Sequence, residues 1–178
     1  GVHGVQVVDE GFGADWIDTM NKFQTLNEFK DSSIIVSGGD QVNDSDEALY
    51  DLFINESMSS IAFAPTWGRL HDQGNLYDSH YNLPNLSSSY GNEMNTSDYY
   101  YKYNNVLFMH INTETADYKS GYEGHKAFLE NAVATNPDCT WKIVVLHFSF
   151  FTGGRHSTDS RVIGFRDALA GTFNDLGV

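Results

Sequence analysis

The first third of the chain alternates between short apolar runs and segments with helical periodicity. Residues 33–37 and 61–64 are short apolar runs, stopped by glycine and by proline, and they predict buried strands. Apolar residues recur three or four positions apart from about Asp15, and again over residues 46–54, which predicts two amphipathic helices. The valines within residues 5–8 predict a further strand before them. This alternation favours an α/β fold, with helices packed on a parallel sheet.

The rest of the chain begins with a long stretch that has no clear period. Residues 68–98 are rich in glycine, asparagine, serine and tyrosine, and they predict a loop. Two aromatic or β-branched runs then flank Asn104 and Asn105, which tolerate the positive φ angles of a type I′ turn and so predict a β-hairpin. The elements expected after the loop are strands at 99–103 and 106–111, a helix ending near 136, a strand at 141–147 and a helix at 160–170.

Amino-acid composition excludes several classes of binding partner and site for this chain. The 178 residues hold 24 acidic and 10 basic side chains, a formal charge of −14, which excludes a nucleic-acid-binding role and adsorption to an anionic membrane. Cys139 is the single cysteine, so an intrachain disulfide and a cysteine-rich zinc site are excluded. The apolar runs have the length of strands, and no membrane span is expected. The length suits one domain, residues 1–178.

The ends of the chain and its sequons bear on localisation. The sequence starts at Gly1 without an initiator methionine or a signal-peptide core, so we expect a mature or excised piece of a longer protein. Four N-glycosylation sequons begin at Asn43, Asn55, Asn85 and Asn95. Together with the low lysine content they favour a secreted glycoprotein, and the alternative is chance occurrence in a chain rich in asparagine and serine.

Side chains that can do chemistry follow three of the predicted strands. They are Asp40, His71, Asp72, His147, Arg155 and His156. Ligands of open α/β sheets bind outside the carboxyl ends of the strands, and a carboxylate with imidazoles suits a divalent metal ion. Each residue also has a structural alternative: Asp40 as a turn or N-cap residue, His147 as a half-buried residue at a strand end, and the others as surface residues of loops.

The order of these motifs resembles the calcineurin-like metallophosphoesterase superfamily. Gly39-Asp40-Gln41-Val42-Asn43 is followed by a turn that carries His71-Asp72, and then by Val144-Val145-Leu146-His147 after a strand. The resemblance covers most of the chain, and it is closest to a secreted branch similar to purple acid phosphatases. It implies a β-sandwich of mixed sheets flanked by helices, here incomplete at one or both ends.

The resemblance also implies a role for each residue. Asp40 would bridge two metal ions (Fe, Zn or Mn), and His147 would bind the second of them. His71 would act as acid or charge stabiliser over the phosphate, oriented by Asp72. Arg155 and His156 would contact the phosphate-ester substrate. In such sites two metal ions clamp the phosphate oxygens and activate a water for in-line attack.

The sequence also departs from the family pattern. The family's first aspartate motif is not cleanly present around Asp9, its asparagine ligand before His71 is replaced, with Asn75 nearby as a substitute, and the closing Gly-His-x-His is absent. Two functions are therefore expected as alternatives. One is metal-dependent hydrolysis of phosphate esters. The other is a non-catalytic secreted glycoprotein that binds or self-associates through residues 77–122, which hold nine of the ten tyrosines.

Overall fold

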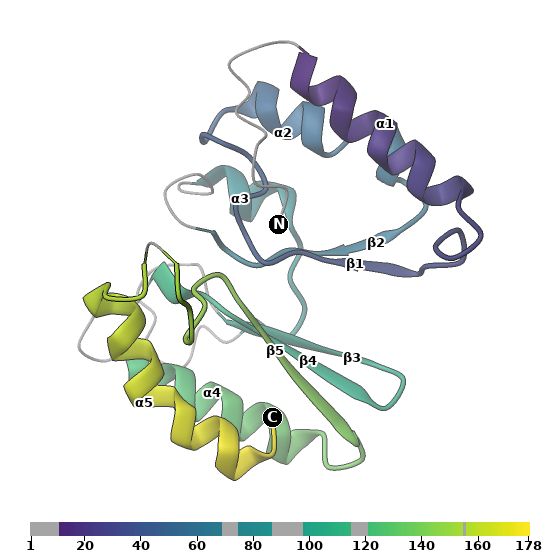
Figure 1. The fold of residues 1–178 in the computed structure, drawn as a ribbon. Helices are drawn as coiled ribbons and strands as arrows, with labels where there is room; N and C mark the ends of the chain where they lie inside the picture. The colour runs from purple at the N-terminus through teal and green to yellow at the C-terminus, as the bar shows by residue number, and fades with distance from the viewer. Residues whose placement is uncertain (1–10, 69–74, 87–97, 115–120, 155) are drawn as a thin grey trace. The chain divides into compact units, whose positions relative to one another are not determined.

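The computed structural model divides the chain into two compact units, each with its own sheet and core (Figure 1). Unit 1 is Gly1–Tyr81 and unit 2 is Asn82–Val178. The structure describes residues 11–68, 75–86, 98–114, 121–154 and 156–178. Both units combine helices with strands, so the expected α/β class is confirmed at this level.

Unit 1 is built around two short parallel strands. Its elements are α1 (Gly11–Thr25), β1 (Ile34–Val36), α2 (Glu47–Phe53), a 3₁₀ helix (Glu56–Met58), β2 (Ala62–Ala64) and α3 (Asn75–His80). Ile34 pairs with Ala62 and Val36 with Ala64, which confirms the predicted parallel arrangement. The strand predicted within residues 5–8 lies outside the described residues.

The helix α3 corrects the prediction of a loop over residues 68–98. It has six residues, which is too short for a helical repeat of apolar positions to be recognised in the sequence. Its Tyr77 is buried and packs against Trp67 with ring centroids 4.6 Å apart. Tertiary packing therefore stabilises a helix that the local sequence pattern does not predict.

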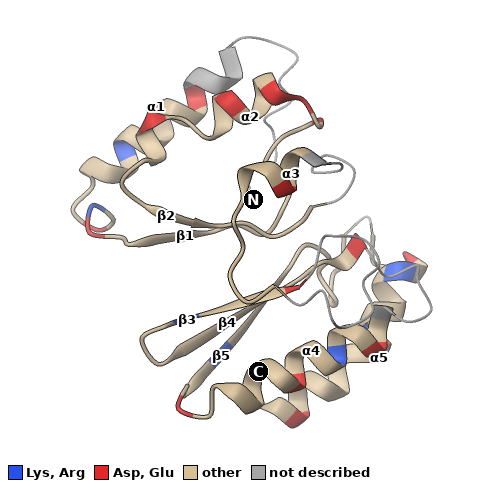
Figure 2. Cartoon of the chain, turned by 180° about the vertical axis from the view of Figure 1, so that it is seen from behind, with Lys and Arg blue, Asp and Glu red and all other residues tan. Residues whose placement is uncertain are grey.

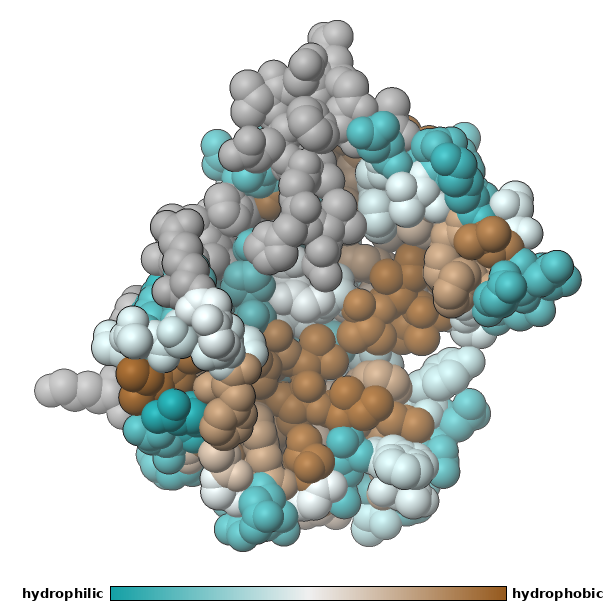
Figure 3. All heavy atoms as spheres, in the orientation of Figure 1, coloured by the Kyte–Doolittle hydropathy of each residue, from teal (hydrophilic) through white to brown (hydrophobic). Residues whose placement is uncertain are grey.

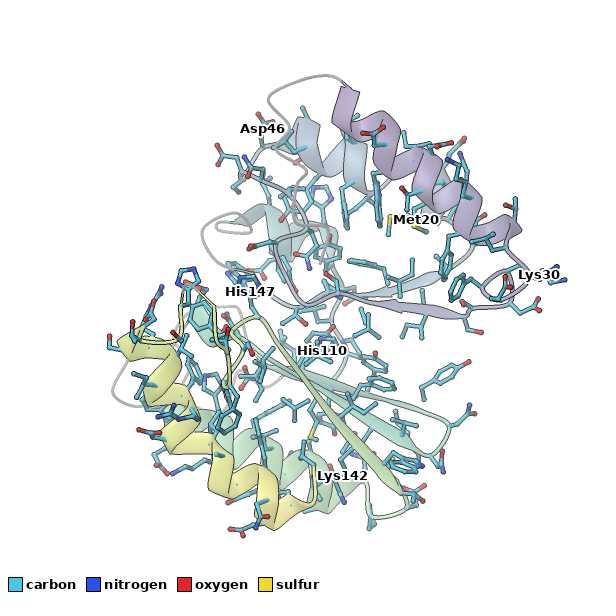
Figure 4. The ribbon with its side chains drawn as sticks, viewed as in Figure 1. Met20, Lys30, Asp46, His110, Lys142 and His147 are labelled. Atoms are coloured by element: carbon cyan, nitrogen blue, oxygen red, sulfur yellow. The ribbon has the colours of Figure 1, made fainter. Side chains whose placement is uncertain are left out.

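The core of unit 1 lies between its helices and its strands. Met20 extends from α1 toward the strands (Figure 4) and is buried with four residues of the segments that follow. These are Val42, Tyr50, Phe53 and Met58. The N-terminus of α2 is capped by Asp46, whose carboxylate accepts the Ala48 N–H at 2.9 Å.

Unit 2 is a three-stranded mixed sheet with two long helices. Its elements are β3 (Tyr99–Tyr103), β4 (Val106–Ile111), α4 (Gly121–Thr135), β5 (Trp141–Leu146) and α5 (Ser160–Leu176). The sheet order is β3-β4-β5, with β3 antiparallel and β5 parallel to β4. The predicted hairpin is confirmed. Its turn is not type I′, because Asn104 has a positive φ of 53° and Asn105 does not, whereas type I′ needs both.

The two faces of this sheet differ in character. One face carries Leu107, Met109 and Ile111, which form the core of unit 2 with apolar residues of α4 and α5. On the other face aromatic rings stack across the strands: Tyr101 lies on Phe108 at 5.0 Å between ring centroids. Burial raises the pKa of Tyr101 to about 12. Tyr101 therefore packs largely on its own sheet.

Acidic residues and hydrophobic side chains are concentrated on different elements of the fold. Acidic residues line α1, α2 and the loop before α2 (Figure 2). Hydrophobic side chains gather over the strands (Figure 3). Among the described residues, no helix is both long enough and apolar enough to cross a membrane.

Candidate functional site

In unit 1 the candidate site is the turn that follows β1. Gly39 has φ 103° and Asp40 has φ 53°, so two consecutive residues are in the left-handed region. Glycine reaches this region without a steric penalty, and aspartate tolerates it better than most residues. Asp40 is thus held in a sharp turn at the carboxyl end of a parallel strand, the place where α/β sheets present ligand-binding groups.

Gln41 fastens this turn to the segment after β2. Its Nε2 donates to Ser37 Oγ at 3.0 Å and to the carbonyl oxygen of Thr66 at 2.9 Å, and the side chain is buried. The Ser37 N–H donates to the Ala64 carbonyl at 2.9 Å, which extends the strand pairing by one residue. The segments after the two strands of unit 1 therefore converge, as expected for a site at one rim.

A cavity of about 400 Å³ lies beside the Asp40 turn, within unit 1. Its walls come from one side of α1, from β1 and from two phenylalanines, and its polar residues belong mainly to the turn. Trp16, Thr19 and Phe23 line the cavity from α1, Phe53 and Phe63 line it from α2 and β2, and Asp40 lines it from the turn. The volume lies within the range of about 300–1,000 Å³ that is typical of small-molecule pockets.

In unit 2 the candidate site is the carboxyl end of β4 and β5. Ile111 pairs with Leu146, so Asn112 and His147 follow at the same edge of two parallel strands. His147 is half-buried and lies directly after β5 (Figure 4), with its ring centroid 5.8 Å from that of Phe148. The predicted placement of His147 after a strand is confirmed.

A buried polar pair supports this edge. His125 Nδ1 on α4 lies 2.5 Å from Asp98 Oδ2, and both side chains are almost fully buried. The other oxygen of Asp98 accepts the Asn112 N–H at 2.9 Å. The Asn112 side chain in turn accepts the Glu114 N–H at 2.9 Å. One carboxylate therefore joins α4, the start of β3 and the segment after β4.

Arg161 lies in the first turn of α5 and contacts this segment. Its guanidinium is 3.4 Å from Glu114 Oε2, and its Cζ stands 5.1 Å from the ring centroid of Phe148. The α5 N-cap, Asp159, lies 3.9 Å from Arg161 Nε and 3.8 Å from His156 Nδ1. His156 is half exposed. The edge thus carries both signs of charge, with the cation partly neutralised by two carboxylates.

The predicted site residues fall in both units. Asp40 belongs to unit 1, while His147 and His156 belong to unit 2. His71, Asp72 and Arg155 lie outside the described residues. Within the described parts of the chain, no group of three histidine, cysteine, aspartate or glutamate side chains could hold a metal ion.

The sequons have different surroundings. Asn55 caps the 3₁₀ helix, accepting the Ser57 N–H at 2.9 Å and donating to the Leu52 carbonyl at 2.9 Å. Asn85 is exposed, has φ 49° and donates to the Tyr100 carbonyl at 3.0 Å. Asn43 is half-buried in the turn after Asp40, and Asn95 lies outside the described residues.

Two features of this edge were missed by the sequence analysis, the Asp98–His125 pair and the Arg161–Glu114 pair. A signal for the first existed, because His125 falls on the helical stripe of Phe128, Leu129 and Ala132. A histidine on a buried stripe requires a polar partner. The identity of this partner could not be predicted from the local sequence, because Asp98 lies 27 residues away from His125.

Comparison of the chain with protein-family models, with curated proteins and with solved structures finds no match.

Proposed function

We propose that the protein is a secreted, metal-dependent phosphoesterase in which Asp40 and His147 each contribute a metal ligand. The observation that carries the proposal is the Asp40 turn. Asp40 has a left-handed backbone conformation at the end of β1, and the buried Gln41 fixes the turn. Unusual backbone conformations of this kind concentrate at functional sites. His147 lies directly after β5 in unit 2.

The donor chemistry of these two residues fits the metal ions expected. A carboxylate oxygen and an imidazole nitrogen suit Fe, Zn or Mn. A bound divalent ion supplies Lewis-acid polarisation of the phosphate and a water of lowered pKa. We further propose that His71 supplies a proton to the leaving group, that Asp72 orients it, and that Arg155 and His156 contact the substrate.

The negative net charge of the chain means that the metal would also be needed for substrate binding. At −14 the chain repels phosphate esters, so a phosphate substrate requires local positive charge at the site. Arg161 does not supply it, because Glu114 and Asp159 lie within 4 Å of its guanidinium. Removal of the metal is therefore expected to abolish substrate binding as well as turnover.

The test compares Asp40→Asn with Asp44→Asn in the full chain. Asparagine tolerates the left-handed region, so Asp40→Asn retains the turn while removing a carboxylate oxygen. Asp44 is an exposed aspartate of the same loop and serves as the control. We expect Asp40→Asn to lose bound metal, measured by plasma mass spectrometry, together with hydrolysis of 4-nitrophenyl phosphate. Wild-type protein that binds no Fe, Zn or Mn and hydrolyses no ester would overturn the proposal.

A second candidate function is a non-catalytic secreted glycoprotein that self-associates. The observation that favours it is an exposed apolar row at one end of the unit 2 sheet, where Tyr103, Val106 and Trp141 pair across the strands. Trp141 is 65% exposed and Tyr103 is 42% exposed. We expect a dimer or larger species in sedimentation velocity that Trp141→Lys dissociates. A wild-type chain that stays monomeric at high concentration would exclude this function.

A further inference from the structure

The cavity in unit 1 has an aromatic wall that is fixed before any ligand arrives. The rings of Trp16 and Phe53 stack with centroids 5.0 Å apart, and Phe63 meets Phe53 edge-on at 5.4 Å. Trp16 Nε1 donates to the Phe53 carbonyl at 2.8 Å, which holds the indole in this orientation. A wall of this kind offers ring faces and edges without the entropic cost of ordering it.

The polar end of the cavity is the turn that carries Asp40. Among the described residues that line the cavity, Asp40 is the one with a formal charge. Ser37 and Gln41, which line the same end, are hydrogen-bonded to each other at 3.0 Å. The cavity is therefore amphipathic, with an aromatic body along α1 and β1 and a carboxylate at the exit of β1. A ligand that fits it has a flat apolar body and a polar group at one end.

We propose that this cavity binds a flat aromatic group, and that this group is the alcohol part of the phosphate ester. The second clause rests on the proposed function, in which Asp40 holds metal at the polar end. The substrates would then be aryl phosphate esters rather than sugar or glycerol phosphates, because a polyhydroxylated alcohol would lose hydrogen bonds to water against aromatic walls.

Two threonines of α1 provide a matched pair for the test. Thr19 lines the cavity, and its hydroxyl donates to the Asp15 carbonyl at 2.7 Å. Thr25 lies outside the lining, and its hydroxyl donates to the Lys22 carbonyl at 2.8 Å. Both side chains are exposed. Thr19→Phe therefore places a large ring at the lining of the cavity, while Thr25→Phe makes the same chemical change on the same helix away from it.

The first measurement needs neither metal nor turnover. Equilibrium dialysis of 2-naphthol, which has the aromatic group without phosphate, measures binding to the cavity directly. We expect saturable 1:1 binding to wild type and to Thr25→Phe, and a Kd raised by at least about tenfold in Thr19→Phe. Absence of saturable binding to the wild type, or equal binding to all three proteins, would overturn the proposal.

The second measurement separates the substrate class from the proposed function. It compares kcat/KM for 2-naphthyl phosphate with that for glycerol phosphate in the metal-loaded protein. We expect wild type and Thr25→Phe to prefer the naphthyl ester, and Thr19→Phe to lower this ratio by about tenfold. If both esters are cleaved with a ratio that Thr19→Phe does not change, the substrate class is wrong and the proposed function stands. If 2-naphthol binds but neither ester is cleaved, the proposed function and the substrate class both fail, and the aromatic site remains.

Discussion

His125 and Asp98 form a hydrogen-bonded pair in the interior of unit 2, with His125 Nδ1 2.5 Å from Asp98 Oδ2 and both side chains at most 4% exposed. The same carboxylate accepts the Asn112 N–H at 2.9 Å, so it bonds to α4 and to the segment after β4 at once. This segment lies beside the one that carries His147. The pair therefore links the core of unit 2 to the edge of its candidate site.

Removing one member of this pair should destabilise the protein strongly. Asp98→Ala removes the carboxylate that bonds the His125 imidazole and the Asn112 N–H, and a buried polar group that loses such a partner costs about 1–3 kcal/mol in free energy of unfolding. Urea denaturation followed by circular dichroism measures this. The double variant Asp98→Leu with His125→Phe should cost less than the sum of its single variants, because no polar group of the pair is left unpaired. Additive losses would show that the two side chains do not interact.

The backbone of Asp40 supports a second prediction about stability. At φ 53° a β-branched residue is strained, so Asp40→Val should lower the free energy of unfolding by about 1–2 kcal/mol relative to Asp40→Gly. Asp44 provides the control, because its φ is not positive and glycine there only adds entropy to the unfolded chain. At Asp44 the order should reverse, with valine at least as stable as glycine. The same order at both positions would contradict the left-handed turn.

Sequence patterns located most elements, because the features they use are local. The parallel strands around residues 33–37 and 61–64 and the hairpin on either side of Asn104 were predicted, and the structure confirms them. The helix α3 was not, since its stability depends on packing of Tyr77 against Trp67 rather than on its own period. The hairpin turn was assigned the wrong type, because two asparagines permit positive φ without requiring it.

The candidate site was predictable only in part, for a physical reason. Asp40 and His147 each follow a strand, and position after a strand can be read from sequence. The sequence shows Gln41 only as a member of the Gly39–Asn43 motif. In the structure its side chain donates a hydrogen bond to the Thr66 carbonyl, 25 residues away, and so holds the turn in place. Side-chain pairs of this kind depend on which distant segments the fold brings together, and local sequence patterns do not show that.

Tyr101 makes the stability of the protein sensitive to alkaline pH. Burial raises the pKa of its phenol from 10.0 to about 12, so the folded state favours the neutral form. The contribution is fully present below pH 10 and is lost as the pH rises from about 10 to about 12, where the unfolded chain ionises first. Absorbance titration at alkaline pH should show a late-ionising tyrosine in wild type that is missing in Tyr101→Phe. A titration curve unchanged by Tyr101→Phe would contradict the burial of this hydroxyl.

Two glycines of α5 should respond in opposite directions to alanine. A Cβ at Gly171 meets nothing within 4 Å, so Gly171→Ala should gain the helix propensity of alanine, about 1 kcal/mol in free energy of unfolding. A Cβ at Gly164 would overlap the Tyr122 hydroxyl oxygen and lie 3.3 Å from its Cζ. Tyr122 cannot easily move away, because its ring packs edge-on against the buried Phe165 at 5.1 Å. Gly164→Ala should therefore lose that gain and destabilise the protein, by about 1–3 kcal/mol for an overpacked site. Adding Tyr122→Phe to Gly164→Ala removes the nearest atom and should restore part of the loss. Thermal unfolding of these three variants and the wild type measures the changes, and equal gains for both glycines would refute the close packing of α4 on α5.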